Sequence, residues 1–350
     1  MNNLPPNISK LIGQMIMVGI KGHDRDAAYG FFEKNYQYHV GGIILYDEDI
    51  TTNPPSLHNI RSQKQLSIFT NYLQEFSSNP LLIGIDQEGG KVNRLKEIYG
   101  FPKTISWSKL GKINDLKKTE FESNNIAKLL GRCGINLNFS PVLDLDLSKD
   151  NIISQKDRAI SSDSKIVYEH AQTLIKCHLD HDIIPVGKHF PGQGSSQGDT
   201  HQDWVDVSDT WSEIELRPYK KLIQANNISA IMTSHLYNKY LDESYPATLS
   251  KKIINDLLRE KMNFKGVVIS DDPQMEAISS RYNLERIIEL MICAGVDIFC
   301  FGNNLVYDPD IVKKIHQAVL HLLKNQKIDI SMLEKSNERI MNLKSKIGLL

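Results

Sequence analysis

The stretch that decides the fold reads IIPVGKHFPGQGSSQGDTH and spans residues 183–201. It opens with a short apolar run typical of a buried strand, so we expect Lys188 and His189 where that strand meets solvent. Glycine-rich, turn-forming residues follow, as in a mobile loop that carries chemistry. Near its end stand Asp199 and His201, a carboxylate that can orient an imidazole and tune it as a proton donor or acceptor.

Similar apolar runs recur along the whole chain. They give eight candidate strands: Met15–Ile20, Gly42–Leu45, Leu81–Ile85, Ile135–Phe139, Ile183–Val186, Ala230–Thr233, Gly266–Ile269 and Val296–Phe301. Most are apolar on both faces, as are parallel strands covered by helices. Helix-like segments lie between and after them: Leu66–Phe76, Phe121–Leu130, Lys165–His178, Ser212–Ala225, Lys251–Lys261, Leu284–Cys293, Asp308–Leu323 and Ser331–Ile347. The pattern predicts an α/β fold, a TIM-type (β/α)8 barrel that forms a single domain over residues 1–350.

Composition narrows the class of protein. The chain has 350 residues, of which 41% are hydrophobic and 24% charged, and its formal net charge of −1 favours neither nucleic acid nor an anionic membrane as partner. The run Met15–Ile20 is too short to span a bilayer and has no basic leader, so a cytoplasmic protein is expected. No Cys-X-X-Cys spacing occurs, and buried free thiols are expected for all four cysteines: Cys133, Cys177, Cys293 and Cys300.

Polar residues gather at or just after the ends of the apolar runs. They are Asp86, Asn138, Lys188, His189, Ser234, His235, Asp271 and Asn303. Active sites of barrels are built at this edge of the strands. Any one of these residues taken alone could simply cap the helix that follows, but their concentration at one edge of the strands predicts a pocket for a polyhydroxylated ligand. His235 is equally compatible with lining this pocket and with a bond to the barrel rim.

Two further segments carry chemistry. GIDQEGGKVNR, residues 84–94, has a double glycine that allows a tight turn and lets Asp86 and Arg94 point toward one centre. VISDDPQM, residues 268–275, places Asp271 at a strand end, and Asp272 is expected to face away and support the loop.

Together the three segments resemble the family-three glycoside hydrolases, specifically the bacterial β-N-acetylglucosaminidases. The family pattern has an Asp-Gln-Glu-Gly-Gly segment, a Lys-His-Phe-Pro-Gly segment leading to Asp-Ser-His, and a Ser-Asp-Asp segment with Met shortly after. This chain has all three in family order, with Thr200 in place of the serine. It departs elsewhere without losing a reacting group, at Lys91 for arginine, Gln193 for a second histidine and Pro273 for leucine.

The resemblance implies a role for each matching position. Asp271 corresponds to the catalytic nucleophile, His201 to the acid/base and Asp199 to the carboxylate partner of that histidine. The positions implied to hold the non-reducing sugar are Asp86, Arg94, Arg158, Lys188 and His189. Ala159-Ile160 follows Arg158 where the family tends to have a small residue and an aromatic one.

The chemistry of the residues agrees with these roles. A retaining glycosidase needs a nucleophile on one side of the anomeric carbon and a proton donor on the other. An imidazole, whose ordinary pKa is about 6.5, can act as acid and then as base near neutrality. Two-domain relatives take this group from a following domain, and the chain ends after its last expected barrel helix. His201 is therefore the candidate.

The leading hypothesis is an exo-acting, retaining β-N-acetylglucosaminidase. It would release N-acetylglucosamine from muropeptides, the peptidoglycan fragments of cell-wall recycling. The alternatives are a phosphorylase, which would transfer the same sugar to phosphate, another β-glycosidase, and an inactive sugar-binding barrel. No metal is expected, because the candidate histidines lack the paired spacing of zinc sites, and no nucleotide cofactor, because no glycine-rich phosphate motif follows a strand.

Overall fold

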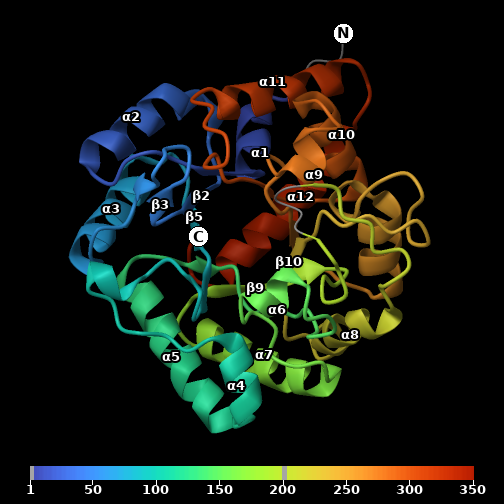
Figure 1. Ribbon diagram of the computed structural model, residues 1–350. Helices are drawn as coiled ribbons and strands as arrows, with labels where there is room; N and C mark the ends of the chain where they lie inside the picture. Colours follow the sequence, from blue (N-terminus) through green and yellow to red (C-terminus); the bar gives the residue numbers. More distant parts are fainter. Residues whose placement is uncertain (1–3, 199–202) are drawn as a thin grey trace.

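Eight parallel strands form a barrel at the centre of the molecule, with helices around it (Figure 1). The computed structural model describes residues 4–198 and 203–350. The barrel strands are β1 (Ile16–Gly19), β2 (Gly42–Leu45), β5 (Leu82–Ile85), β8 (Leu137–Asn138), β9 (Ile184–Phe190), β10 (Ala230–Thr233), β11 (Val267–Ile269) and β12 (Phe299–Phe301).

The strands pair in chain order, and β12 returns to pair with β1. A bridge between Ile269 and Ile298 joins the end of β11 to the segment that enters β12, so the sheet closes almost completely. The expected α/β barrel is thereby confirmed. Every residue of these strands is buried, because side chains fill the barrel and helices cover its outside.

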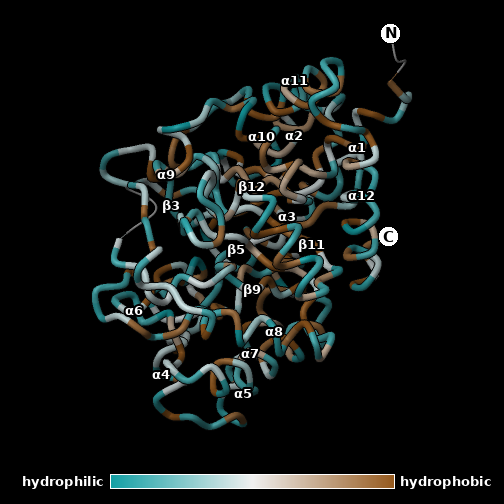
Figure 2. Tube along the Cα trace, turned by 90° about the vertical axis from the view of Figure 1, so that its right-hand side faces the viewer, coloured by the Kyte–Doolittle hydropathy of each residue, from teal (hydrophilic) through white to brown (hydrophobic). Residues whose placement is uncertain are grey.

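Helices connect successive strands and cover the barrel. They are α1 (Ile8–Gln14), α2 (Arg25–Asn35), α3 (Gln63–Phe76), α4 (Trp107–Ile113), α5 (Leu116–Arg132), α6 (Ile152–Gln155), α7 (Ser164–Leu179), α8 (Arg217–Gln224), the π-helix η5 (Lys252–Lys261), α9 (Glu276–Ser279), α10 (Leu284–Ala294), α11 (Ile311–Lys324) and α12 (Ile330–Ser345). In the side view of Figure 2, α6, α9 and β3 (Glu48–Asp49) lie at one end of the molecule and α12 at the other. The end with α6 and α9 is formed by the loops that follow the strands, where the functional site lies.

One expectation about residues 183–201 was wrong. Strand β9 does not stop at Val186 but continues to Phe190, so Lys188 and His189 lie inside it. Their side chains are buried rather than at the solvent boundary. A strand can bury a lysine at its end only when acidic groups from neighbouring segments neutralise it, and such groups are present here.

The remaining differences concern short elements. Each expected strand overlaps an observed one, but several elements were not expected: the helices α1, α2, α4, α6 and α9 and two hairpins, β3 with β4 (Ser56–Leu57) and β6 (Gln87–Gly89) with β7 (Val92–Asn93). All four cysteines are free, and Cys293 alone is only partly buried. Within the described ranges, no helix combines the length and apolar character that crossing a membrane requires.

Candidate active site

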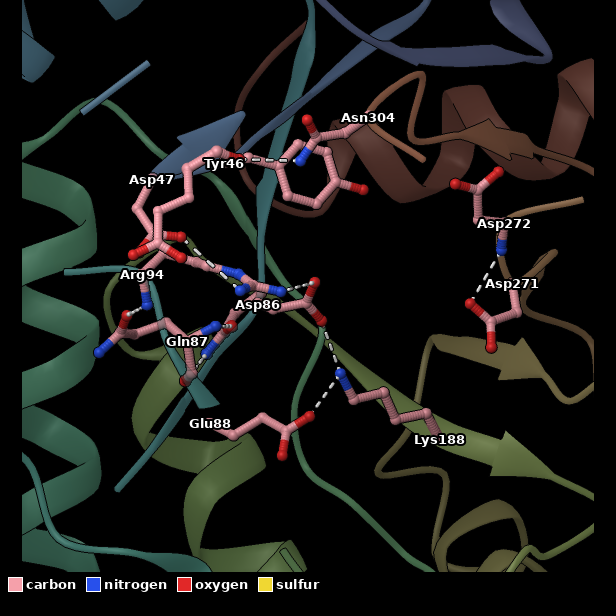
Figure 3. Close-up of polar contacts among 12 residues, drawn as sticks. Tyr46, Asp47, Asp86, Gln87, Glu88, Arg94, Lys188, Asp271, Asp272 and Asn304 are labelled. Carbon is pink, nitrogen blue, oxygen red and sulfur yellow. Dashed lines mark hydrogen bonds and ion pairs between the residues drawn. The ribbon is translucent and has the colours of Figure 1, made fainter. Parts of the chain in front are cut away.

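Lys188 lies at the centre of the charged residues at the carboxyl edge of the barrel (Figure 3). Its Nζ lies 2.7 Å from Oδ1 of Asp86, which follows β5, and 2.7 Å from Oε1 of Glu88 in β6. Its side chain and that of Glu88 are each only 2% exposed. The lysine that sequence reasoning placed at the strand boundary is thus fully neutralised by two carboxylates.

The hairpin of β6 and β7 turns Arg94 back toward Asp86. Gly89 and Gly90 adopt φ values of 97° and 63°, and a Cβ on Gly90 would stand 2.4 Å from Cβ of Ser106, so only glycine fits this turn. The side-chain oxygen of Gln87 accepts the backbone N–H of Arg94 at 3.1 Å.

The guanidinium of Arg94 consequently sits between two acids. Its Nη2 lies 3.6 Å from Oδ2 of Asp86, and its Nη1 lies 3.6 Å from Oδ1 of Asp47. Asp47 is also bonded by Lys96. The ring of Tyr46 lies 5.6 Å from the Arg94 guanidinium carbon, within reach of a cation–π contact. The predicted convergence of Asp86 and Arg94 is therefore present.

Arg158 extends the network on the other side of Glu88. It makes a two-pronged bond to the Glu88 carboxylate, with Nε to Oε2 at 2.9 Å and Nη2 to Oε1 at 2.8 Å. Its Nη2 also lies 3.3 Å from Nε2 of His189. Nδ1 of His189 lies 2.7 Å from Oδ2 of Asp144. A carboxylate accepts only, so we assign the proton of a neutral His189 to Nδ1, which leaves Nε2 to accept from Arg158.

We call the six connected residues the charged cluster: Asp86, Glu88, Arg94, Arg158, Lys188 and His189. The structure brings all five sequence-predicted sugar contacts together in it. Burial alone would raise the pKa of Asp86, but Lys188 and Arg94 outweigh burial and hold that pKa well below its usual value. Burial would likewise raise the pKa of Glu88, but Arg158 and Lys188 lower it to about 2. Asp86 and Glu88 are therefore anionic near neutral pH, which suits them to accepting hydrogen bonds from hydroxyl groups rather than to transferring protons.

Asp271 faces the cluster from the far side of the barrel mouth, two residues after the end of β11 (Figure 3). Its Oδ1 accepts the backbone N–H of Asp272 at 2.8 Å. The Asp272 carboxylate points elsewhere, accepting from the backbone N–H of Gln274 at 3.0 Å and lying against Gly302, as expected for a residue that supports the loop. Burial, together with the charge of Asp271, raises the pKa of Asp272 to about 7.

His235 bonds the barrel rim. Its Nε2 lies 2.9 Å from the carbonyl oxygen of Asp272, and its Nδ1 lies 2.8 Å from Oγ1 of Thr248. A carbonyl can only accept, so Nε2 carries a proton. His235 thereby ties the loop after β10 to the turn that bears Asp271.

Two predicted catalytic residues, Asp199 and His201, lie outside the described residues. The described part of their loop runs to Gly198, and two buried carboxylates bind its backbone. Oδ1 of Asp144 accepts the backbone N–H of Gln193 at 2.8 Å, and the carboxylate of Glu215 accepts the backbone N–H of Gly194 at 2.7 Å.

Sequence reasoning missed Glu88, Asp144, Asp47 and Tyr46 as members of the site. Glu88 stands inside the Asp-Gln-Glu-Gly-Gly segment and carried a signal, since a carboxylate beside a glycine turn at a strand end has few structural reasons to be there. Asp144 is an acid within the apolar run of residues 142–145, which is a comparable signal. Asp47 and Tyr46 follow β2 with no distinguishing pattern. Within residues 4–198 and 203–350, no cluster of histidine, cysteine, aspartate or glutamate has the makings of a metal site.

Fold and site define a class. A barrel whose carboxyl edge carries a network of paired acids and bases opposite the carboxyl group of Asp271 is suited to bind a polar, uncharged substrate and to react with it. That is the arrangement of a barrel hydrolase acting on carbohydrate.

Comparison with known proteins identifies the family. The model of the glycosyl hydrolase family 3 N-terminal domain matches residues 8–343. The chain is 33% identical over 282 residues to a β-hexosaminidase of Nitrosomonas eutropha, covering 77% of this chain and 75% of the relative. It is 30% identical over 346 residues to the β-hexosaminidase LpqI of Mycobacterium tuberculosis, covering 95% and 81%. The chain therefore belongs to glycosyl hydrolase family 3, and it is a glycoside hydrolase of the β-hexosaminidase type.

A solved structure agrees. The family 3 β-N-acetylglucosaminidase of Paenibacillus sp. FPU-7 superposes with a TM-score of 0.87 at 26% identity over 99% of this chain. The chain spans 63% of the length of that protein.

Proposed function

We propose that the protein is an exo-acting, retaining β-N-acetylglucosaminidase. The observation that carries this proposal is the position of Asp271 across the barrel mouth from the charged cluster (Figure 3). A terminal sugar bound by the hydroxyl-accepting carboxylates of the cluster would present its anomeric carbon toward Asp271. The family branch to which this protein belongs, and the names of its relatives, favour N-acetylglucosamine as the terminal sugar.

The reaction would proceed in two steps. In the first, an oxygen of Asp271 forms a bond to the anomeric carbon while the glycosidic bond breaks and His201 gives its proton to the departing oxygen. In the second, His201 takes a proton from water, the water oxygen attacks the anomeric carbon, and the bond to Asp271 breaks. Asp199 would stabilise the protonated imidazole and orient it. The charged cluster would hold the ring hydroxyls more strongly as the ring distorts toward the transition state.

We further propose a biological setting. The substrates would be N-acetylglucosamine-containing muropeptides, the protein would act in the cytoplasm during peptidoglycan recycling, and residues 1–350 would form one catalytic domain. The family branch supports this substrate and setting, and the barrel formed by strands within residues 16–301 supports one catalytic domain.

A panel of chromogenic β-glycosides that differ only at the 2-position of the sugar tests the activity. The 2-acetamido glycoside is expected to be cleaved with a kcat/KM at least about 100-fold above that of the 2-hydroxy glycoside, since an acetamido contact is worth about 3 kcal/mol when its partner would otherwise be left unpaired. A preference for the 2-hydroxy sugar would reject the acetamido specificity. Running the same assay with and without phosphate, with product analysis, distinguishes hydrolysis from transfer to phosphate.

A further inference from the structure

The carboxyl group of Glu215 is buried directly beneath the glycine-rich loop. Glu215 belongs to η3 (Glu213–Leu216), a single helical turn that leads into α8, and its side chain is 1% exposed. Oε2 accepts the backbone N–H of Gly194 at 2.7 Å, and Oε1 accepts the hydroxyl of Ser195 at 2.6 Å. Two consecutive loop residues are thus bound by one side chain.

The loop fits closely around this side chain. Gly192 has a φ of 116°, and a Cβ there would stand 2.6 Å from Cβ of Glu215. A Cβ on Gly194 would stand 2.1 Å from the carbonyl oxygen of Leu145. The two glycines therefore let the backbone approach Glu215 on one side and the segment after β8 on the other.

Other buried groups hold the same segment from the opposite side. Asp144 accepts the N–H of Gln193 at 2.8 Å, and Nδ2 of Asn151 donates to the carbonyl of Gln193 and, at 3.0 Å, to Oγ of Ser196. Each of residues 193–196 is thereby hydrogen-bonded to a buried side chain, through the main chain at Gln193 and Gly194 and through the hydroxyl at Ser195 and Ser196.

Burying the carboxyl group of Glu215 costs free energy, which indicates that this residue does more than fill space. No lysine or arginine of the described chain forms an ion pair with it, and the ionisable groups that face it are Asp144 and Tyr219. Burial, reinforced by the charge of Asp144, raises the pKa of Glu215 to about 7. A carboxyl group without a cation is destabilising in such a place, so an apolar residue would serve packing better.

We infer that Glu215 is a positioning residue for the proposed acid/base loop. Only Gln197 and Gly198 separate the hydrogen-bonded residues 193–196 from Asp199, so the bonds to Gly194 and Ser195 set the point from which the chain reaches His201. This inference rests on the proposed function, because it assigns to Glu215 the placement of the proton donor and base.

The test compares Glu215→Ala with Glu215→Gln on two substrates. Loss of the anchor displaces the acid, and a displacement of about 1 Å costs up to about 100-fold. For Glu215→Ala we expect kcat/KM to fall about 10- to 100-fold for a disaccharide, whose leaving group needs a proton. For a dinitrophenyl glycoside, whose leaving group departs unprotonated, we expect a fall of less than about 3-fold. Glu215→Gln can accept from Gly194 and bond Ser195 through its amide, so it should restore the disaccharide rate to near the wild-type value.

Three controls make the result decisive. Val319→Ala opens a cavity beneath α11 without touching the loop, so any general effect of lost stability that it causes should change both rates equally. Ser195→Ala removes one of the two hydrogen bonds to Glu215, so its loss of kcat/KM should differ less between the two substrates. If Glu215→Ala fails to fold, Ser195→Ala still tests the proposal. His201→Ala supplies the reference for a missing acid.

The outcomes separate the two proposals. If His201→Ala shows the substrate difference and neither Glu215→Ala nor Ser195→Ala does, the positioning role of Glu215 is overturned while the proposed mechanism stands. If His201→Ala itself shows no substrate difference, the proposed mechanism fails, and the role of Glu215 fails with it.

Discussion

The ammonium nitrogen of Lys188 lies 2.7 Å from Oδ1 of Asp86, although the two residues are 102 positions apart in the chain. Lys188 projects from β9 and Asp86 follows β5, and β8 lies between these strands in the barrel. Their ion pair therefore reaches across a neighbouring strand to organise the mouth of the barrel. Glu88, in the hairpin that follows β5, also contacts Lys188, and Arg94, which comes directly after that hairpin, reaches the network through Asp86.

Removing Lys188 should destabilise the fold as well as the site. Lys188→Met leaves the buried carboxylate of Glu88 and the partly buried one of Asp86 without their shared cation, and breaking a buried pair such as Lys188–Glu88 costs about 3–5 kcal/mol. Urea unfolding should show this loss in the free energy of unfolding. The double variant Lys188→Met/Glu88→Gln, which removes one of the stranded charges, should recover part of it. Equal stabilities of the single and double variants would show that the Lys188–Glu88 contact is energetically unimportant.

The residues that face the pocket should matter for substrate more than for folding. Asp86→Ala and Arg94→Ala should each lower kcat/KM about 10- to 100-fold, because a charged hydrogen bond contributes about 1.5–3 kcal/mol and strengthens as the sugar ring distorts. Steady-state kinetics with the preferred chromogenic glycoside measures the loss. Lys165→Ala, which removes an exposed charge on α7, is the matched control and should leave the kinetics unchanged. Wild-type kinetics in both pocket variants would make Asp86 and Arg94 structural.

Asp271 should prove indispensable. Asp271→Ala removes the only described group proposed to attack the anomeric carbon, and its loss should lower kcat by several orders of magnitude. A slow-reacting 2-deoxy-2-fluoro sugar analogue should label the wild-type enzyme at Asp271, as read by mass spectrometry of peptides. Asp272→Asn keeps the neighbouring backbone N–H that bonds Asp271, so it should still be labelled there. A label on any other residue would refute the assignment.

The sequence predicted the barrel because each strand is buried on both sides, so apolar runs stand out locally without any knowledge of partners. It missed α2, whose apolar residues form one short central run between polar ends and whose start is marked only by the cap of Asp24. It also missed hairpin strands of two or three residues, which are too short to show a period. The site residues were likewise predicted where their signal is local in the sequence. Asp86, Arg94 and Lys188 were found because they lie in dense motifs, whereas the burial of Lys188 depends on acids from elsewhere in the chain. Glu215 had no local signal at all, because its importance comes from a loop that begins more than twenty residues earlier.

The pH dependence of stability should reveal the buried carboxyl of Glu215. Its folded pKa is raised to about 7 from an ordinary 4.5, so the native state holds this proton more tightly than the unfolded chain does. The resulting stabilisation is complete below pH 4.5 and is lost as the pH rises to about 7, a total of about 3–4 kcal/mol at about 1.4 kcal/mol per pH unit. Glu215→Gln cannot ionise, so its free energy of unfolding relative to wild type should rise by that amount between pH 4.5 and 7.5. A difference that is constant across this range would mean that Glu215 has the same pKa in the folded and the unfolded chain, which would refute the raised pKa.

The last prediction concerns the acid/base itself. His201→Ala should lose most activity toward a natural disaccharide, because that leaving group departs only with a proton. A dinitrophenyl glycoside should still form the glycosyl-enzyme, but hydrolysis of that intermediate lacks its base, so stopped-flow traces should show a burst followed by a low steady rate. Azide, small enough to occupy the space of the missing imidazole and needing no deprotonation, should restore the second step and yield a β-glycosyl azide. Asp199→Ala should be a milder version, and its pH–rate profile should shift to lower pH, because removing a neighbouring carboxylate lowers the pKa of an imidazole. Equal penalties for both substrates, with no rescue by azide, would remove His201 from the mechanism.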